Sequence, residues 1–189
     1  AKEQLQKILD FTIQNKSVFI GADLADNESA ADPNSFKWLF DKLYEAGVPI
    51  TIHSGETPDT GAPQRVKDAV EILHATRIGH GIQIFQNQSA IDFVKTNNIH
   101  LEICPISNAL TQAFANRKNH PFFDLYKAGV SVSINSDDPG IFNTYLSDDY
   151  SYLIQNFGLT TDDFAKINKL AYDASFISAA EKKRVMPNL

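Results

Sequence analysis

Short apolar runs alternate along this chain with stretches in which apolar residues recur at helical spacing. Runs rich in valine and isoleucine are typical of buried strands, and the helical spacing is typical of amphipathic helices. The runs predict strands at 18–22, 48–53, 77–79, 99–103 and 130–135. The spacing predicts helices near the start of the chain, at 36–43, 64–74, 89–97 and 122–128, and from 148 to the end.

Strands separated by helices indicate strand–helix units on a parallel sheet. A polar residue ends or follows nearly every predicted strand: Asp23, His53, His80, Glu102 and Asp137. An open doubly wound sheet would be complete at five strands, but it should carry a glycine-rich phosphate turn or a single crevice. Polar groups at so many strand ends favour an α/β fold of the TIM (β/α)8 barrel type, with its active site at the C-terminal face. Three strand–helix units would then be absent from these 189 residues.

The composition is that of an ordinary soluble globular domain, with 43% hydrophobic and 21% charged residues. A net charge of -6 with scattered Lys and Arg argues against a nucleic-acid partner, and no apolar stretch approaches the ~20 residues of a membrane span. Cys104 is the only cysteine, which excludes an internal disulfide framework, and we expect a cytoplasmic location. The chain begins at Ala1 inside a predicted helix, and its only methionine is Met186. We therefore expect a piece of a longer protein, with loss of an initiator methionine from a short native chain as the alternative.

The residues at the strand ends suggest metal-assisted hydrolysis. His53 and Asp137 are suitable ligands for a divalent cation, with zinc the leading choice and then iron or cobalt. A catalytic zinc takes three or more protein ligands and a water, so the chain is short of donors. His80 is available as a base or electrostatic partner for that water, and Glu56 as a general acid if burial raises its pKa. Asp138 would face differently from its neighbour and could bind substrate.

Each of these residues also has a purely structural interpretation. His53 could be a hydrogen-bonded core histidine, and Glu56 could be a helix-start residue favoured by the helix dipole. Asp137 and Asp138 before Pro139 could form a helix N-cap followed by proline at the first helical position. These interpretations do not predict that all such residues occur together at consecutive strand ends.

Four motifs, in this order, resemble the C-terminal motifs of the adenosine deaminase family of metal-dependent amidohydrolases. They are His53-Ser54-Gly55-Glu56, Arg77-Ile78-Gly79-His80-Gly81, Leu101-Glu102-Ile103-Cys104-Pro105-Ile106-Ser107-Asn108 and Ser136-Asp137-Asp138-Pro139-Gly140-Ile141-Phe142. Asp23-Leu24-Ala25 with Glu28 is similar to the family's preceding substrate loop, and residues 160–184 are similar to its closing helices. The resemblance spans nearly the whole chain, so residues 1–189 are expected to be the C-terminal portion of one barrel domain.

The resemblance implies hydrolytic deamination of a 6-aminopurine, adenosine to inosine with release of ammonia, in purine salvage. It implies that His53 and Asp137 bind Zn2+, that His80 acts with the metal-bound water, and that Glu56 protonates the purine N1. It also implies that Asp138 hydrogen-bonds the purine N7. Protonation of N1 activates C6 for attack, which an uncharged purine requires. Cys104 needs no catalytic role.

Two departures from the family pattern limit this resemblance. The family takes further metal ligands from a His-x-His pair on its first strand, and no such pair exists here; His74, His100 and His120 are isolated and do not replace it. We therefore expect the N-terminal portion of the same protein to be a partner, and the chain alone to be inactive. Asp26 stands where many relatives have glycine, which leaves adenosine, adenine and AMP open as substrates. The alternatives are a different amidohydrolase, acting on an amide or another aminated ring, and a non-catalytic binding module.

Overall fold

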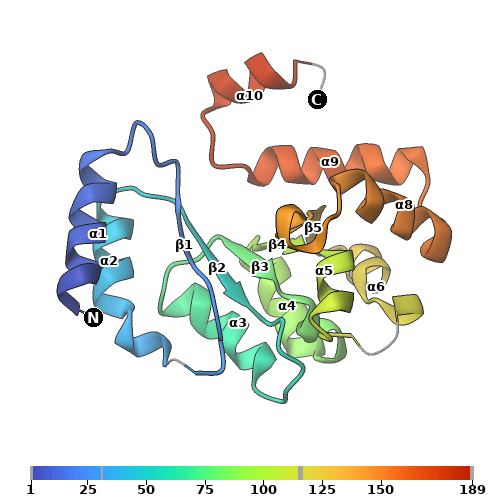
Figure 1. Ribbon diagram of the computed structural model, residues 1–189, viewed down its shortest axis with the longest axis horizontal. Helices are drawn as coiled ribbons and strands as arrows, with labels where there is room; N and C mark the ends of the chain where they lie inside the picture. Colours follow the sequence, from blue (N-terminus) through green and yellow to red (C-terminus); the bar gives the residue numbers. More distant parts are fainter. Residues whose placement is uncertain (1, 31, 115–116, 188–189) are drawn as a thin grey trace.

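The computed structural model describes residues 2–30, 32–114 and 117–187. Parallel strands form one sheet in chain order, so each strand after the first pairs with the strand that precedes it in the sequence (Figure 1). The strands are β1 (Ala22–Leu24), β2 (Ile50–Ser54), β3 (Arg77–His80), β4 (His100–Ile103) and β5 (Ser131–Ile134). The register aligns the strand ends, with Ser54 of β2 opposite His80 of β3. Polar residues at these ends are thereby brought to one edge of the sheet.

The prediction of the first strand was wrong in its position. The apolar segment 18–22 does not form a strand; Val18 and Ile20 are 71% and 55% exposed, and β1 begins only at Ala22. Ala22 pairs with Ile50, the first residue of β2, so no part of β2 remains for the segment before Ala22. An apolar run identifies a strand only where a neighbouring strand can pair with it. The other predicted strands are confirmed, with ends shifted by at most two residues.

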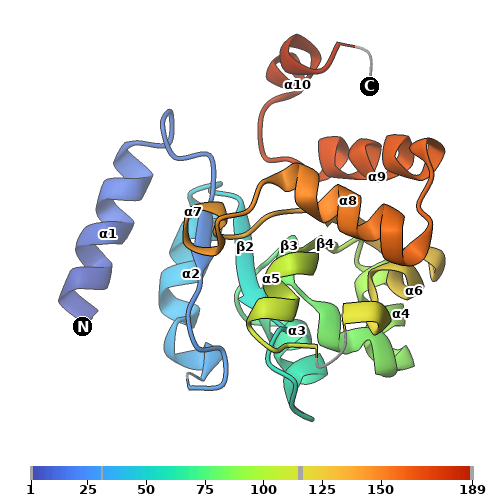
Figure 2. The same ribbon diagram turned by 45° about the vertical axis from the view of Figure 1, so that its right-hand side comes forward.

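The chain opens with α1 (Lys2–Gln14), which precedes β1 and packs beside α2 (Figure 2). The longer helices between the strands are α2 (Lys37–Glu45), α3 (Ala62–Glu71), α4 (Gln88–Thr96) and α6 (Phe122–Lys127), with 3-10 turns at Pro33–Ser35, Ile82–Gln86 and Arg117–Asn119. Two short helices, α5 (Pro105–Leu110) and α7 (Pro139–Phe142), follow the ends of β4 and β5 directly. The chain closes with α8 (Leu146–Phe157), α9 (Thr161–Ala174) and α10 (Ala179–Val185), of which α9 contacts β5.

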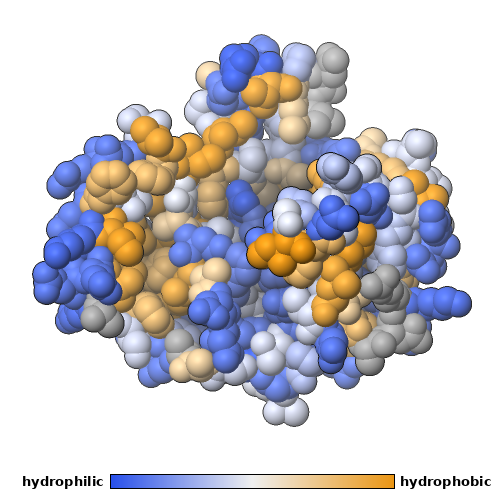
Figure 3. Space-filling view, viewed as in Figure 1, coloured by the Kyte–Doolittle hydropathy of each residue, from blue (hydrophilic) through white to orange (hydrophobic). Residues whose placement is uncertain are grey.

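The core lies between the sheet and its helices. Ile78 and Leu101 on the strands and Val66 and Val94 on the helices are fully buried, which is the burial that holds strand–helix units together. Hydrophobic side chains are also exposed over α1 and the segment that leads to β1 (Figure 3): Ile8, Phe11, Val18, Phe19 and Ile20. Within the described ranges, no helix has both the length and the apolar character needed to cross a bilayer.

Candidate active site

A cavity of about 290 Å³ lies at the C-terminal ends of the strands. Its walls include every site residue predicted from the sequence: Asp26, His53, Glu56, His80, Asp137 and Asp138. These residues come from β2, β3 and the segments after β1, β2 and β5, and the parallel sheet alone explains their convergence. The site was predictable because each residue lies beside a strand end in the sequence.

The backbone at this edge of the sheet adopts left-handed conformations. His80 has φ 63° and Asp137 has φ 58°, values that a residue with a side chain rarely adopts. Gly55 and Gly81, which have φ 72° and 66°, supply the turns beside them. Non-glycine residues held in this region concentrate at functional sites, where the surrounding structure determines the conformation. The conformation is thus a second, independent sign of function at these strand ends.

Three side chains could hold a metal ion together. One ligand atom each from His53, His80 and Asp137 lies within 4.8 Å of the other two. Two imidazole nitrogens and a carboxylate oxygen form a donor set that suits zinc. The Nδ1 of His53 also lies 2.7 Å from Oδ2 of Asp23, and this carboxylate raises the pKa of the imidazole. Asp23 orients the His53 ring in the way that supporting carboxylates orient metal-binding histidines.

His80 is buried at the floor of the cavity. Its Nδ1 lies 3.0 Å from Nδ2 of Asn108, and its Nε2 lies 3.5 Å from Oε2 of Glu56 and 3.9 Å from Oδ2 of Asp137. Burial lowers the pKa of His80, although the Glu56 and Asp137 carboxylates oppose this effect. The neutral imidazole is therefore favoured.

Glu56 is held by two donors on α5 and its continuation. Its Oε1 accepts hydrogen bonds from Oγ1 of Thr111 at 2.8 Å and from Nδ2 of Asn108 at 3.3 Å. With Oε1 occupied, a proton on this carboxyl belongs on Oε2, the oxygen nearer His80. The carboxyl can thus present an acidic proton to the cavity.

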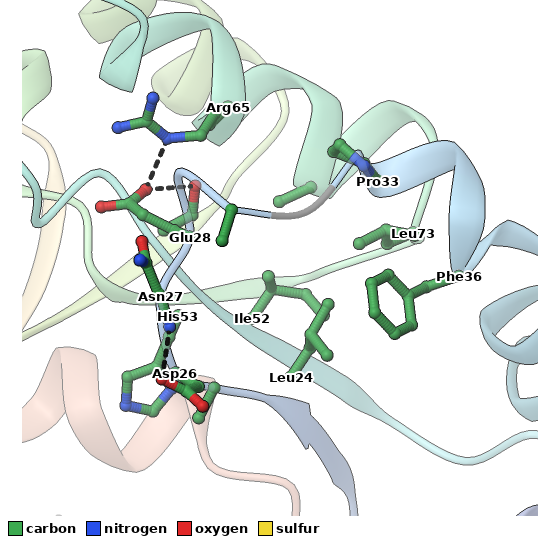
Figure 4. A pocket seen from close by; sticks show the side chains of 14 residues that line it. Leu24, Asp26, Asn27, Glu28, Pro33, Phe36, Ile52, His53, Arg65 and Leu73 are labelled. Atoms are coloured by element: carbon green, nitrogen blue, oxygen red, sulfur yellow. Dashed lines mark hydrogen bonds and ion pairs between the residues drawn. The ribbon is translucent and has the colours of Figure 1, made fainter. Parts of the chain in front are cut away.

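Glu28 fixes the turn that carries Glu56. Its carboxylate accepts hydrogen bonds from the backbone N–H groups of Gly55, Glu56 and Thr57. It also accepts a hydrogen bond from Nε of Arg65 on α3, which Figure 4 shows. Burial raises the pKa of Glu28, but the hydrogen bonds outweigh burial and the net pKa is lowered. Glu28 also borders a second cavity of about 290 Å³ beneath the loop after β1, whose wall is mostly apolar, with Leu24, Ile52 and Phe36.

The two aspartates after β5 have different surroundings. Oδ2 of Asp137 accepts a 2.6 Å hydrogen bond from Oγ of Ser107 on α5. Asp138 occupies the N-cap position of α7 with Pro139 next, as the structural interpretation foresaw, yet its side chain makes no capping hydrogen bond. The exposed Asp138 carboxylate therefore remains available at the mouth of the cavity, as does Asp26, whose Oδ1 accepts only from the adjacent backbone N–H of Asn27 among the described residues.

Glu102 does not join the site, although it was grouped with the strand-end residues. Its carboxylate turns to the Arg77 guanidinium and to Oγ1 of Thr51 inside the sheet. Among the three isolated histidines, His74 pairs with Asp41 at 2.7 Å outside the site, and His100 bonds Ser131 and Ser133. None of these contributes to the cavity.

Sequence reasoning missed the residues that hold the site residues in place. Ser107, Asn108 and Thr111 contact Asp137, His80 and Glu56 from α5 and its end. Two of them lie inside the motif that begins at Leu101, and that position was the available signal. No role could be assigned to them before the placement of α5 over the strand ends was known.

Comparisons with known proteins were made against families, curated sequences and solved structures. The family model described as "Adenosine deaminase" matches residues 1–189. The chain is 38% identical to the adenosine deaminase of Plasmodium gallinaceum over 98% of this chain and 51% of that relative. The solved adenine deaminase of Arthrobacter aurescens superposes with a TM-score of 0.89 at 26% identity, over 99% of this chain and 56% of that one. The solved N6-methyl-AMP deaminase of Arabidopsis thaliana superposes with a TM-score of 0.85 at 26% identity, over 97% of this chain and 53% of that one.

The chain spans about half the length of the curated relatives it matches. The structures that it matches are amidohydrolase TIM barrels, so the predicted barrel class is confirmed, with this chain forming about half of such a barrel.

Proposed function

The chain belongs to the adenosine deaminase family, and from that premise we propose that it is part of an enzyme that converts adenosine and water to inosine and ammonia. One observation carries the proposal: the predicted site residues, three of which could hold a metal ion, line a single cavity at the strand ends. The rest of the barrel, including a His-x-His pair, would come from the N-terminal portion of the same protein.

His53 and Asp137 would hold zinc, and the proximity of their ligand atoms supports this assignment. Zinc, when bound, supplies Lewis-acid activation of water near neutral pH. His80 acts with the attacking water and stabilises its charge by hydrogen bonding, because the buried ring is neutral and its Nε2 faces Glu56 and Asp137.

Glu56 donates a proton to the purine N1 as water adds to C6. One proton of that water passes to the amino group, which leaves as ammonia, and the other returns to Glu56 as the C6 oxygen becomes a carbonyl. The Thr111 and Asn108 donors on Oε1 support this role, since they leave Oε2 to carry the proton. Asp138 donates a hydrogen bond from its carboxyl O–H to the purine N7 at the mouth of the cavity. Asp26 lines the same cavity as Asp138 and contacts the part of the substrate that differs among adenosine, adenine and AMP.

The test is the loss of ultraviolet absorbance on deamination, measured with the complete barrel on adenosine, adenine and AMP. Glu56→Gln is expected to lower kcat by about 100-fold or more, because the amide cannot act as the acid. Glu71→Gln, at an exposed position of α3, is the matched control and should leave kcat unchanged. Full activity of the Glu56→Gln variant, or turnover of unrelated amides in preference to purines, would contradict the proposal.

A further inference from the structure

A line of buried polar groups leads from the start of α6 into the active site. The backbone N–H of Phe122 donates to Nδ1 of His120 at 3.1 Å, and Nε2 of His120 lies 3.3 Å from Oδ1 of Asn108. Nδ2 of Asn108 then reaches Nδ1 of His80 at 3.0 Å and Oε1 of Glu56 at 3.3 Å. Asn108 and His120 are 0% and 1% exposed, so water does not compete for these groups.

The backbone group at the far end fixes the direction of every hydrogen bond in the line. A peptide N–H can only donate, so Nδ1 of His120 accepts and the ring proton sits on Nε2. The rings of Phe114 and Tyr152 lie 5.7 and 6.5 Å from the His120 ring, and burial lowers its pKa to about 3. The ring therefore stays neutral at ordinary pH and always offers the same donor.

That donor fixes the orientation of the Asn108 side chain. Since Oδ1 of Asn108 accepts from His120, its Nδ2 hydrogens face His80 and Glu56. Nδ1 of His80 must then accept, which places the proton of the neutral His80 ring on Nε2. This nitrogen is the one that faces the Glu56 and Asp137 carboxylates.

We infer that His120 is a positioning residue that acts through Asn108 to fix the tautomer of His80 and the orientation of Glu56. Without the His120 donor the Asn108 amide can turn over, and its oxygen would then face His80 and select the opposite tautomer. The catalytic consequence rests on the proposed deaminase function, whereas the tautomer assignment does not.

The experiment is nitrogen-15 NMR of the histidine rings in the 189-residue protein, in which long-range proton–nitrogen correlations distinguish the two tautomers. In the wild-type protein at pH 7.5 we expect both His80 and His120 to carry the proton on Nε2. A wild-type His80 protonated on Nδ1 overturns the inference without any variant, so a variant that fails to fold does not leave it untested.

Three variants test the relay, by which we mean the hydrogen bonds from His120 through Asn108 to His80. His120→Leu should remove the single Nε2–H tautomer of His80, and His120→Gln, which restores an N–H donor, should recover it. His100→Leu is the control, because His100 is also buried and bonds two serines but lies outside the site. A folded His120→Leu protein in which His80 keeps its tautomer would refute the relay.

Activity of the complete barrel provides a separate measurement. His120→Leu should lower kcat at least about tenfold with little change in KM, and His120→Gln should recover most of it. If the NMR result holds but adenosine is not deaminated by the wild type, the positioning inference stands and the proposed function fails.

Discussion

At the scale of single residues, Gly79 on β3 lies tightly against His53. A Cβ added to Gly79 would lie 3.1 Å from both Cγ and Nδ1 of the His53 ring and 3.3 Å from its Cα. The backbone of Gly79 is not left-handed, so the strain in an alanine variant comes from these contacts. An alanine at position 79 therefore requires His53 to shift by a few tenths of an ångström.

Gly79→Ala is expected to displace the His53 ring and to weaken zinc binding by about 10- to 100-fold, the range typical of disturbed supporting groups around a metal. Zinc affinity of the complete barrel, measured by competition with a chelator, checks this. Gly140→Ala is the matched control, since nothing lies within 4 Å of the added Cβ. Equal zinc affinity of the Gly79→Ala and wild-type proteins would rule out His53 as a ligand.

At the scale of the element, α5 is the support for the site. It carries Ser107 and Asn108, and Oδ1 of Asp149 on α8 accepts the backbone N–H of Ile106 at 2.9 Å. Asp149 is fully buried, and its Oδ2 has no hydrogen-bond partner among the described residues. Burial raises the pKa of Asp149 to about 6. At pH 7.5 the group that accepts the hydrogen bond from α5 is therefore a buried carboxylate, and burial of its charge lowers the stability of the folded protein.

Asp149→Asn should make the protein more stable at pH 7.5 by about 1–3 kcal/mol, because the amide keeps an acceptor for Ile106 and removes the buried charge. The carboxyl of the unfolded chain ionises near pH 4, and that of the folded protein only near pH 6. Stability therefore falls as the pH rises from about 4 to 6, and the advantage of the variant vanishes below pH 4.

Urea unfolding at pH 7.5 and pH 4 measures this difference. Asp92→Asn, at an exposed position of α4, is the control and should change stability little at either pH. A destabilised Asp149→Asn protein at pH 7.5 would mean that the charge itself holds α5.

Features that depend on residues close together in the sequence were predictable, whereas contacts between residues far apart in the sequence were not. His53, His80 and Asp137 were predicted because strand ends are local features and a parallel sheet aligns them. Asn108 bonds Glu56 across 52 positions of sequence, and nothing near Asn108 specifies that contact. His120 was interpreted as an isolated histidine, structural or exposed, because nothing in the sequence indicates its contact with Asn108. The misplaced first strand has the same origin, because its start depends on where β2 begins.

At the scale of the whole molecule, the sheet has two open edges. Among the described residues, β1 pairs only with β2 and β5 pairs only with β4. An unpaired edge strand exposes backbone donors and acceptors, and exposed hydrophobic side chains lie near the β1 side. In a closed barrel both edges are paired.

We expect the isolated 189-residue chain to retain no stoichiometric zinc and to show no adenosine turnover, because it lacks a His-x-His pair. Native mass spectrometry should then give a bare 21.0 kDa species. Addition of the remaining roughly 150 residues of a typical barrel should give a zinc-bound complex that deaminates adenosine. Tight zinc and turnover in the chain alone would show that its own ligands suffice.

The neighbour order of the strands bears on how this protein is made. Among the described strands, each strand after β1 pairs with the one synthesised immediately before it, and α9 packs on β5. The ribosome therefore releases each of these strands only after that partner has emerged. The sheet can grow by one strand–helix unit at a time, with α5 and its buried polar residues added only after β2 and β3 have placed His53 and His80.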